Sequence, residues 1–374
     1  MAGFLYIHIP FCMRKCIYCD FLSVPYVGTM AEKYIESLCK ELSLRKDSAG
    51  ELKTAYIGGG TPSLLPQRSL NQLFHCLKEN FIFSDHAEIT VEANPGTLDE
   101  SKIGALRSLG VTRISVGVQS FNNDELKSLG RIHSSDDAAR AVELLNTAGL
   151  GNYSIDLMYG IPGQTMETWG ETVSHALTLT PCHISTYELT PEKKTPLHGL
   201  IRSGEVHLPD EELVLDMYNS AIDRLSASGY EHYEISNFAL PGSACIHNLN
   251  YWNRGEYIGA GAGAHSFMEG RRSRNTEDIK RYCEYADGGI IPSIEISGVG
   301  PAGAAREFIF LGLRKIAGIS VTEAEAHGLN IISAAGLLIK EGYLETARGQ
   351  LRLTRKGLPL TNTVIVRLYE ELGL

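Results

Sequence analysis

Six strand–loop–helix units follow one another through the first 230 residues, and no other feature of the sequence narrows the choice of fold so far. Each unit begins with a short run of β-prone apolar residues, followed by a loop and by apolar residues at helical spacing. The predicted strands cover residues 4–9, 54–57, 88–92, 113–118, 153–158 and 183–189, and the predicted helices cover residues 30–46, 66–80, 99–109, 136–148, 165–179 and 210–228. This alternation predicts a parallel sheet, which right-handed crossovers curl toward a barrel.

Six units are fewer than the eight that close a full (β/α)8 barrel. We therefore predict an α/β fold built on an open, partial (β/α)6 barrel. A doubly wound open sheet is the alternative for the same order of elements. In both folds ligands bind at the C-terminal ends of the strands, so the loops that directly follow the strands are the places to search for a site.

The repeat stops near residue 230, and two segments of different character follow. Residues 231–300 are rich in Gly, Asn, His and aromatic residues with little periodicity, which predicts a loop-rich cover over the barrel mouth. The tail has predicted helices over residues 302–315, 322–327 and 330–341, a hairpin over 343–353 and a last helix. That order is typical of an α+β winged-helix module. The sequence thus predicts three parts: 1–230, 231–300 and 301–374.

The charge balance restricts the partners of the chain. Its 374 residues include 34 Lys and Arg against 44 Asp and Glu, a net charge of -10. Such an acidic chain is a poor match for a broad nucleic-acid surface, so we interpret the tail as a packing or partner module. The N-terminus lacks the pattern of a signal peptide, and no apolar run reaches eighteen residues. Together with cysteines that form no disulfide-like framework, this predicts a cytoplasmic protein.

Three cysteines lie in the loop after the first predicted strand. Cys12, Cys16 and Cys19 have CxxxCxxC spacing, so their thiolates can converge on one centre. Three thiolates suit a cubane iron–sulfur cluster with one open iron better than a structural zinc ion, which takes four protein ligands. A zinc site completed by His8 or by a distant cysteine, and three unrelated buried thiols, are the alternatives.

The CxxxCxxC spacing with Tyr18 before the third cysteine resembles the radical S-adenosylmethionine (SAM) superfamily. The resemblance implies a [4Fe–4S] cluster on Cys12, Cys16 and Cys19, with SAM chelating the open iron through its amino and carboxylate groups. One electron from the cluster then cleaves SAM to a 5′-deoxyadenosyl radical in that superfamily.

Five motifs resemble a narrower family, the oxygen-independent coproporphyrinogen III oxidases and their relatives. They are Tyr-Ile-His-Ile-Pro-Phe-Cys (6–12), Gly-Gly-Gly-Thr-Pro (58–62), Val-Glu-Ala-Asn-Pro (91–95), Gly-Val-Gln-Ser-Phe-Asn (117–122) and Ile-Asp-Leu-Met-Tyr-Gly-Ile-Pro (155–162). The similarity runs from residue 4 through at least residue 270. By this resemblance SAM is contacted by Tyr6, Gly59, Gly60, Thr61, Glu92, Gln119, Arg131 and Asp156. Some relatives hold a second SAM near the position of Tyr18.

The chemistry of these residues suits such a ligand. A carboxylate at a strand end can hold ribose hydroxyls, and Arg131 can pair with the carboxylate of the methionine part. Glycine lets backbone approach a ligand because it lacks a Cβ atom. Taken singly, each residue is an ordinary turn or surface residue. Spaced one per βα unit, they predict a pocket.

Two departures point away from the oxidase. The decarboxylating enzyme carries a further cysteine two residues after the third, where this chain has Phe21. The stretch His247-Asn248-Leu249-Asn250-Tyr251-Trp252 resembles the HNxxYW motif of the haem chaperone (HemW) branch. An imidazole is a good axial ligand of haem iron, and Tyr251 and Trp252 can supply flat apolar faces for the macrocycle.

We predict that His247 binds the haem iron, with Cys245 and His265 as the other candidates; a hydrogen-bonded structural role is the alternative for a histidine beside aromatic residues. The predicted function is therefore haem binding and delivery to apo-haemoproteins of respiration, with a cluster, SAM and haem bound. Oxidative decarboxylation of coproporphyrinogen III and radical degradation or methylation of haem are the competing functions. No catalytic residue is assigned. Peripheral membrane contact and a cluster-dependent homodimer stay open.

Overall fold

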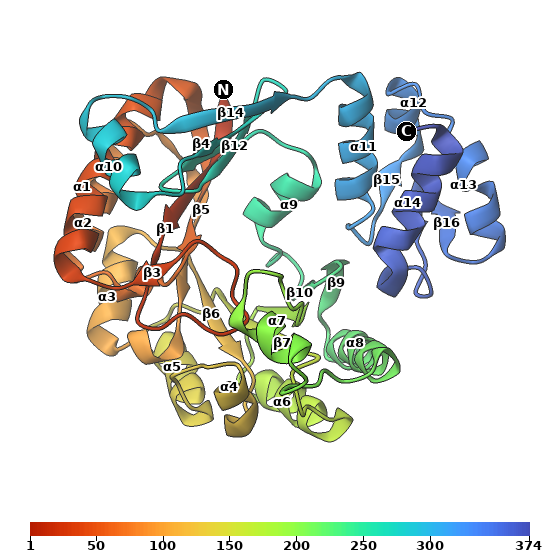
Figure 1. Cartoon of the computed structure of the whole chain (residues 1–374), viewed down its shortest axis with the longest axis horizontal. Helices are drawn as coiled ribbons and strands as arrows, with labels where there is room; N and C mark the ends of the chain where they lie inside the picture. The colour runs from red at the N-terminus through yellow and green to blue at the C-terminus, as the bar shows by residue number, and fades with distance from the viewer.

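A nine-stranded sheet forms the centre of the computed structural model, which describes the backbone of residues 1–374 and all side chains except those of residues 295 and 296 (Figure 1). Six strands run parallel in sequence order: β1 (Ala2–Ile9), β4 (Ala49–Gly59), β5 (Phe83–Ala93), β6 (Arg113–Gln119), β7 (Tyr153–Tyr159) and β8 (His183–Glu188). A doubly wound sheet reverses its strand order at a switch point, and this sheet does not. The predicted partial (β/α)6 barrel is confirmed, and the doubly wound alternative is wrong.

Helices cross over between the strands. They are α1 (Gly28–Arg45), α2 (Gln67–Asn80), α3 (Glu100–Leu109), α4 (Asn123–Ser128), α5 (Ser135–Thr147), α6 (Met166–Thr178), α7 (Pro196–Arg202) and α8 (Glu211–Ala227). Buried side chains at helical spacing, such as Tyr34, Leu38 and Leu42 of α1, pack on alternate residues of the strands, such as Leu5 and Ile7 of β1. The other strand residues face the interior of the partial barrel, and these include the polar residues of the site.

Residues 231–300 are not the loop-rich cover that we expected. Strands β9 (Glu231–Glu234) and β10 (Asn237–Ala239) extend the sheet beyond β8, and β11 (Ile258–Ala260) pairs in parallel with β1 at the opposite edge. The segment also contains α9 (Ile246–Trp252), α10 (Ile279–Asp287) and a separate sheet of β12 (His265–Met268), β13 (Arg271–Asn275) and β14 (Ser293–Gly298). Strands of three to six residues are too short to show periodicity, which explains the error. The central sheet therefore continues past residue 230.

A buried carboxylate holds this segment to the first helix. Glu41 accepts hydrogen bonds from Arg45, from Tyr282 of α10 (2.6 Å) and from Asn275 of β13 (2.7 Å). It also accepts one from the backbone N–H of Gly261, which follows β11 (2.8 Å). Both of its oxygens are thus satisfied, as a buried charge requires. The contacts fix β11 beside β1, the strand that leads into the cysteine loop.

The C-terminal unit follows the predicted order of elements closely. It consists of α11 (Pro301–Gly312), β15 (Ile319–Ser320), α12 (Val321–Ala326), α13 (Ile331–Lys340), β16 (Leu344–Ala347), β17 (Gln350–Leu353) and α14 (Thr361–Leu372). Arg348 and Gly349 both have positive φ angles (52° and 76°), as a two-residue hairpin turn requires. Figure 1 shows this unit beside the barrel, with α9 between the sheet and α11. Among the described residues, no helix has the length and apolar character needed to cross a membrane.

Candidate functional site

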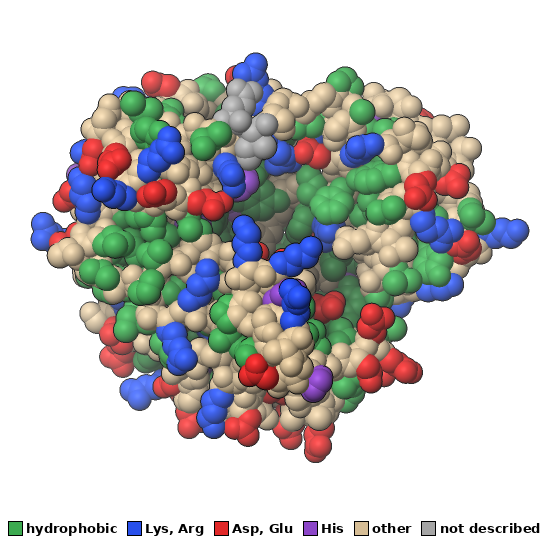
Figure 2. Space-filling view, viewed as in Figure 1, with side chains coloured by type: hydrophobic (Ala, Val, Ile, Leu, Met, Phe, Trp, Pro, Cys, Tyr) green, Lys and Arg blue, Asp and Glu red, His purple; other side chains and the backbone are tan. Residues whose placement is uncertain are grey.

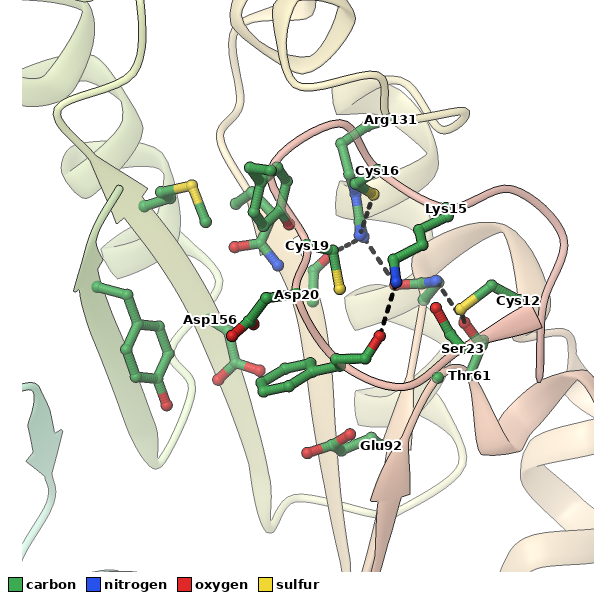
Figure 3. Close-up of a pocket in the computed structure, with 18 of the residues that line it drawn as sticks. Cys12, Lys15, Cys16, Cys19, Asp20, Ser23, Thr61, Glu92, Arg131 and Asp156 are labelled. Atoms are coloured by element: carbon green, nitrogen blue, oxygen red, sulfur yellow. Dashed lines mark hydrogen bonds between the residues drawn. The ribbon is translucent and has the colours of Figure 1, made fainter. Parts of the chain in front are cut away.

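The cysteine loop leaves β1 at the C-terminal edge of the sheet. The short strands β2 (Phe11–Cys12) and β3 (Val24–Pro25) pair in parallel and close its base, where the N–H of Tyr26 donates to the carbonyl of Cys12 (2.9 Å). Lys15 donates across the loop to the carbonyl of Phe21 (2.8 Å). Cys12, Cys16 and Cys19 are free, half-exposed thiols that line the same cavity, whose volume is about 400 Å³. Figure 3 shows them on one loop, above Glu92 and Asp156.

This cavity brings together nearly all of the residues that the sequence indicated. Its lining includes Cys12, Cys16, Tyr18, Cys19, Gly59, Gly60, Thr61, Glu92, Gln119, Arg131 and Asp156. Tyr6 is the exception, since it does not line the cavity; its hydroxyl lies 3.0 Å from Nδ1 of the buried His8. The strand-end residues converge because parallel strands end at the same edge of the sheet.

A chain of polar contacts connects two of the cysteines. The hydroxyl of Thr61 donates to the sulfur of Cys12 (3.7 Å) and accepts from the amide of Asn94 (2.9 Å). The amide oxygen of Asn94 accepts from Arg131 Nη2 (2.7 Å), and Arg131 Nη1 donates to the sulfur of Cys16 (3.6 Å). Arg131 also donates to the carbonyl of Gly117. The loops after three different βα strands thereby fix the positions of two thiols.

Glycine is required after β4 by close packing of the chain on itself. A Cβ atom at Gly60 would lie 2.6 Å from the carbonyl oxygen and 2.8 Å from the nitrogen of Phe11. At Gly59, where φ is +112°, it would lie 2.5 Å from the His8 ring. The N–H of Gly60 donates to the carbonyl of Ile9 (2.8 Å) and the N–H of Thr61 to that of Phe11 (2.7 Å). The glycine turn therefore positions the residue just before Cys12.

Two carboxylates lie at the inner end of the cavity. Glu92 accepts from the Tyr56 hydroxyl (2.8 Å) and from the N–H of Gly59 (2.9 Å), and Asp156 accepts from Ser115 (2.9 Å) and Ser154 (3.2 Å). Burial raises the pKa of Glu92 to about 7, against the two hydrogen bonds that lower it. Burial also raises the pKa of Asp156. Such carboxylates are well placed to accept hydrogen bonds from a ligand's hydroxyl groups.

Gln119 ends β6 with a φ angle of +70°, in the left-handed region that non-glycine residues avoid. The pairing of β6 with β7 shifts register between Gly117 and Gln119. Residues in this conformation often occur at binding sites, because the surrounding structure must hold them there. The bulge turns the Gln119 side chain toward the cavity.

The residues fit a cubane cluster with SAM. No three His, Cys, Asp or Glu side chains among the described residues are grouped closely enough for a single metal ion, whereas three thiolates of a cubane each bind a different iron. Burial raises the pKa of Cys12 and of Cys19, and Arg131 opposes this rise at Cys12. Arg131 Nε is buried with no partner in the described part of the chain, so it can still donate to an anionic ligand.

Helix α9 carries the HNxxYW motif and lies between the sheet and α11 (Figure 1). The carboxylate of Glu88, on β5, accepts from the N–H groups of Ile246 and His247 (3.2 Å each) and so caps the helix. The His247 ring is buried: Nδ1 lies 2.6 Å from the Thr54 hydroxyl and Nε2 lies 2.9 Å from the Tyr251 hydroxyl. Burial lowers the pKa of His247 to about 3.

Of the other two candidates for the haem iron, one is buried like His247 and one is exposed. Cys245 is buried and its thiol donates to Glu88 (3.4 Å), whereas His265 is exposed at the start of β12, near Arg272 and Arg274. Tyr251 packs edge-on against Tyr257, and Trp252 lies beneath Arg314. His247 itself has a protein hydrogen-bond partner at each of its two ring nitrogens.

Four residues of this region were not among the predicted site residues: Asn94, Thr54, Tyr56 and Glu88. Asn94 stands in a motif directly after a strand, so its position could have indicated it. The other three lie within strands, and their partners on α9 are more than 150 residues away in the sequence. Only the folded chain brings them together.

The chain is similar to known proteins along most of its length. Residues 6–176 match the family model described as the Radical SAM superfamily. Heme chaperone HemW of Bacillus subtilis (strain 168) is 36% identical over 375 residues, covering 98% of this chain and 99% of that protein. HemW of Lactococcus lactis subsp. lactis (strain IL1403) is 39% identical over 368 residues, covering 96% and 95%. HemW of Escherichia coli (strain K12) is 42% identical over 279 residues, covering 73% of each chain.

A solved structure shares the fold. Coproporphyrinogen III oxidase (HemN) from Escherichia coli, a radical SAM enzyme, superposes with a TM-score of 0.85 at 22% identity, covering 98% of this chain and 90% of that one. At this identity the likeness concerns the fold alone. The HemW proteins of Bacillus subtilis and Lactococcus lactis are more similar in sequence to this chain than HemN is, and they cover nearly its whole length. The chain therefore belongs to the heme chaperone HemW family of the radical SAM superfamily.

Proposed function

We propose that this protein binds haem and delivers it to apo-haemoproteins, using a radical SAM barrel that holds a [4Fe–4S] cluster and SAM. The observation that carries the proposal is the full-length similarity to HemW proteins, which includes helix α9 with its His247 motif. Delivery to apo-haemoproteins of respiration and a cytoplasmic location of this protein are parts of the proposal.

In this proposal Cys12, Cys16 and Cys19 hold the cluster, and the residues around the cavity hold SAM. Arg131 pairs with the carboxylate of SAM through its free Nε atom, and Glu92 and Asp156 accept from its hydroxyl groups. Gln119, Gly59, Gly60 and Thr61 complete the walls, and Tyr18 lies beside Cys16 and Arg131. When bound, the cluster supplies one-electron reduction. Tyr6 does not line the cavity and acts through His8 and through Tyr56, on which its ring stacks.

His247 is the proposed ligand of the haem iron, with Tyr251 and Trp252 beside it. The geometry sets a condition on this role, since both ring nitrogens of His247 are occupied by Thr54 and Tyr251. A histidine that binds iron ordinarily keeps one nitrogen on a hydrogen-bond partner while the other binds the metal. One of the two contacts must therefore open when haem binds.

The decarboxylating oxidase is the second candidate function, because that enzyme shares the fold. Phe21 argues against it: its side chain is 63% exposed and lines the cavity at the position where the oxidase family carries a cysteine. An anaerobic assay with reconstituted protein, SAM and coproporphyrinogen III separates the two functions. Formation of protoporphyrinogen IX would favour the oxidase.

Titration with ferric haem tests the proposal directly. We expect a Soret band that shifts on binding and that is lost in His247→Ala, followed by transfer of the haem to an apo-cytochrome. His265→Ala and Cys245→Ala test the rival ligands and should leave the band unchanged. A Soret spectrum that survives His247→Ala unaltered overturns the ligand assignment. Titration before and after cluster reconstitution shows whether haem binding depends on the cluster.

A further inference from the structure

The two nitrogens of His247 have different neighbours, and this difference fixes the state of the ring. Nδ1 lies 2.6 Å from the Thr54 hydroxyl, and Nε2 lies 2.9 Å from the Tyr251 hydroxyl. The ring is buried and each nitrogen faces a hydroxyl group rather than a carboxylate, which suits a neutral imidazole with a hydrogen on one nitrogen and a lone pair on the other.

The lone pair belongs on Nε2. A phenol hydroxyl, with a pKa of about 10, is a stronger hydrogen-bond donor than the aliphatic hydroxyl of threonine. The better donor therefore faces the acceptor nitrogen: Tyr251 donates to Nε2, and Nδ1–H donates to Thr54. In this arrangement each His247 nitrogen has one hydrogen-bond partner, and the Nε2 lone pair accepts the hydrogen bond from the Tyr251 hydroxyl.

We propose that Thr54 sets the tautomer of His247 and that the Tyr251 hydroxyl caps its Nε2 atom until haem displaces it. The inference rests on the proposed role of His247 as the iron ligand, and it assigns Tyr251 a role opposite to that expected from the sequence. Instead of offering a flat face to the macrocycle, its hydroxyl competes with iron for the same lone pair.

The local structure lets Tyr251 move while His247 stays. Glu88 holds the first turn of α9 through the N–H groups of Ile246 and His247, and the His247 ring stacks on Tyr56 with 5.2 Å between ring centroids. Besides His247, the Tyr251 ring packs edge-on against Tyr257, at 4.7 Å between centroids. In the proposal the half-buried Tyr251 side chain rotates away from Nε2, while the fully buried His247 keeps its place.

The surface of the molecule is hollowed near this helix. Figure 2 shows a hollow in the middle of the molecule with hydrophobic side chains on its walls, at the place where Figure 1 has α9 between the sheet and α11. Phe310, on α11, is 38% exposed beside Arg314, whose guanidinium lies 4.5 Å from the centroid of the Phe310 ring. The side chain of Trp252 also contacts Arg314. An apolar wall with a cation fits a macrocycle that bears carboxylates.

Tyr251→Phe removes the cap and keeps the aromatic ring. We expect the rate of ferric haem binding, measured by stopped-flow absorbance at the Soret band, to rise by about five- to tenfold, which corresponds to the loss of one ordinary hydrogen bond. Tyr257→Phe is the matched control, because it removes a hydroxyl from the neighbouring ring that interacts with Arg272 rather than with His247. Its rate of haem binding should stay close to that of the unchanged protein.

The outcomes separate the cap from the ligand assignment. A binding rate that is unchanged or slower in Tyr251→Phe, with the Soret band still lost in His247→Ala, overturns the cap alone. A Soret band that survives in His247→Ala overturns both the ligand assignment and the cap. A readout without haem is available from long-range ¹⁵N–¹H NMR spectra of histidine-labelled protein. We expect His247 to carry its hydrogen on Nδ1, and a hydrogen on Nε2 overturns the proposal.

Discussion

The phenol ring of Tyr56 stacks on the imidazole of His247, with 5.2 Å between ring centroids and 29° between planes. The same tyrosine donates its hydroxyl to Glu92 at 2.8 Å. One side chain thus forms the wall between the cofactor cavity and helix α9. The carboxylate that we propose for SAM and the histidine that we propose for haem are therefore separated by a single residue.

Tyr56→Phe tests the cavity side of this wall. The variant keeps the ring against His247 but removes the hydrogen bond that orients Glu92. We expect SAM affinity to fall roughly tenfold, because hydrogen bonds to charged groups contribute about 1.5–3 kcal/mol. Isothermal calorimetry on reconstituted protein measures this change, and the haem Soret band should be kept.

Tyr153→Phe is the control for Tyr56→Phe. It removes a hydroxyl that donates to the carbonyl of Leu179 (2.6 Å), away from the cavity. If both variants weaken SAM binding equally, the effect is general destabilisation and the role given to Tyr56 is wrong.

Gly60→Ala should prevent the cysteine loop from closing. The added Cβ would lie 2.6 Å from the Phe11 carbonyl oxygen, which belongs to the backbone and cannot rotate away as a side chain could. Overpacking of this kind typically costs about 1–3 kcal/mol. We expect iron content and the visible absorbance of the cluster after anaerobic reconstitution to fall well below those of the unchanged protein.

Gly96→Ala provides the comparison. Gly96 follows β5, and a Cβ there would meet no atom within 4 Å. This variant should reconstitute normally. Normal iron content in Gly60→Ala would show that the loop tolerates the shift and that the close approach is not needed for the cluster.

The sequence predicted best those elements whose structure is determined by their own residues. The strands and helices of the six βα units could be predicted because each has its own apolar period and ends in a distinct motif, as β4 does at Gly59. Strand β11 could not, because three residues carry no period and its place beside β1 depends on Glu41 and the Gly261 backbone. Likewise the motif indicated His247, but its burial depends on Thr54 and Tyr56, which no local pattern connects to α9.

Arg131→Lys tests the proposed SAM carboxylate site. Arg131 contacts Cys16, Asn94 and Gly117 with two of its nitrogens and keeps Nε free. A lysine ammonium cannot make these contacts at once, because its donors radiate from one atom. We expect SAM affinity to fall by about tenfold or more while the cluster still assembles, since a charge-assisted hydrogen bond is roughly twice as strong as a neutral one.

Arg107→Lys is the matched change on an exposed guanidinium that donates to the Ala148 carbonyl (2.7 Å). It should bind SAM as the unchanged protein does. If Arg131→Lys keeps full SAM affinity, the carboxylate of SAM is held elsewhere.

Glu234 should make the free energy of unfolding depend on pH. The residue is 1% exposed, and burial raises its pKa from 4.5 to about 7, against hydrogen bonds from Asn237 and Ser236. Between these values the folded protein binds a proton that the unfolded chain has lost. Its contribution to the free energy of unfolding therefore falls as pH rises from about 4.5 to 7, by about 1.4 kcal/mol per pH unit and roughly 3 kcal/mol in total.

Glu234→Gln removes the titration and keeps an oxygen that can accept from the Ser236 N–H. Urea unfolding at pH 5 and pH 8 should show the unchanged protein losing about 2–3 kcal/mol relative to this variant. Glu231→Gln changes an exposed position on the same strand. Its free energy of unfolding should change between the two pH values as that of the unchanged protein does. If the free energy of unfolding of Glu234→Gln also changes with pH as that of the unchanged protein does, Glu234 is ionised in the folded protein. Arg314, the cation that opposes the rise in its pKa, would then be the compensating charge.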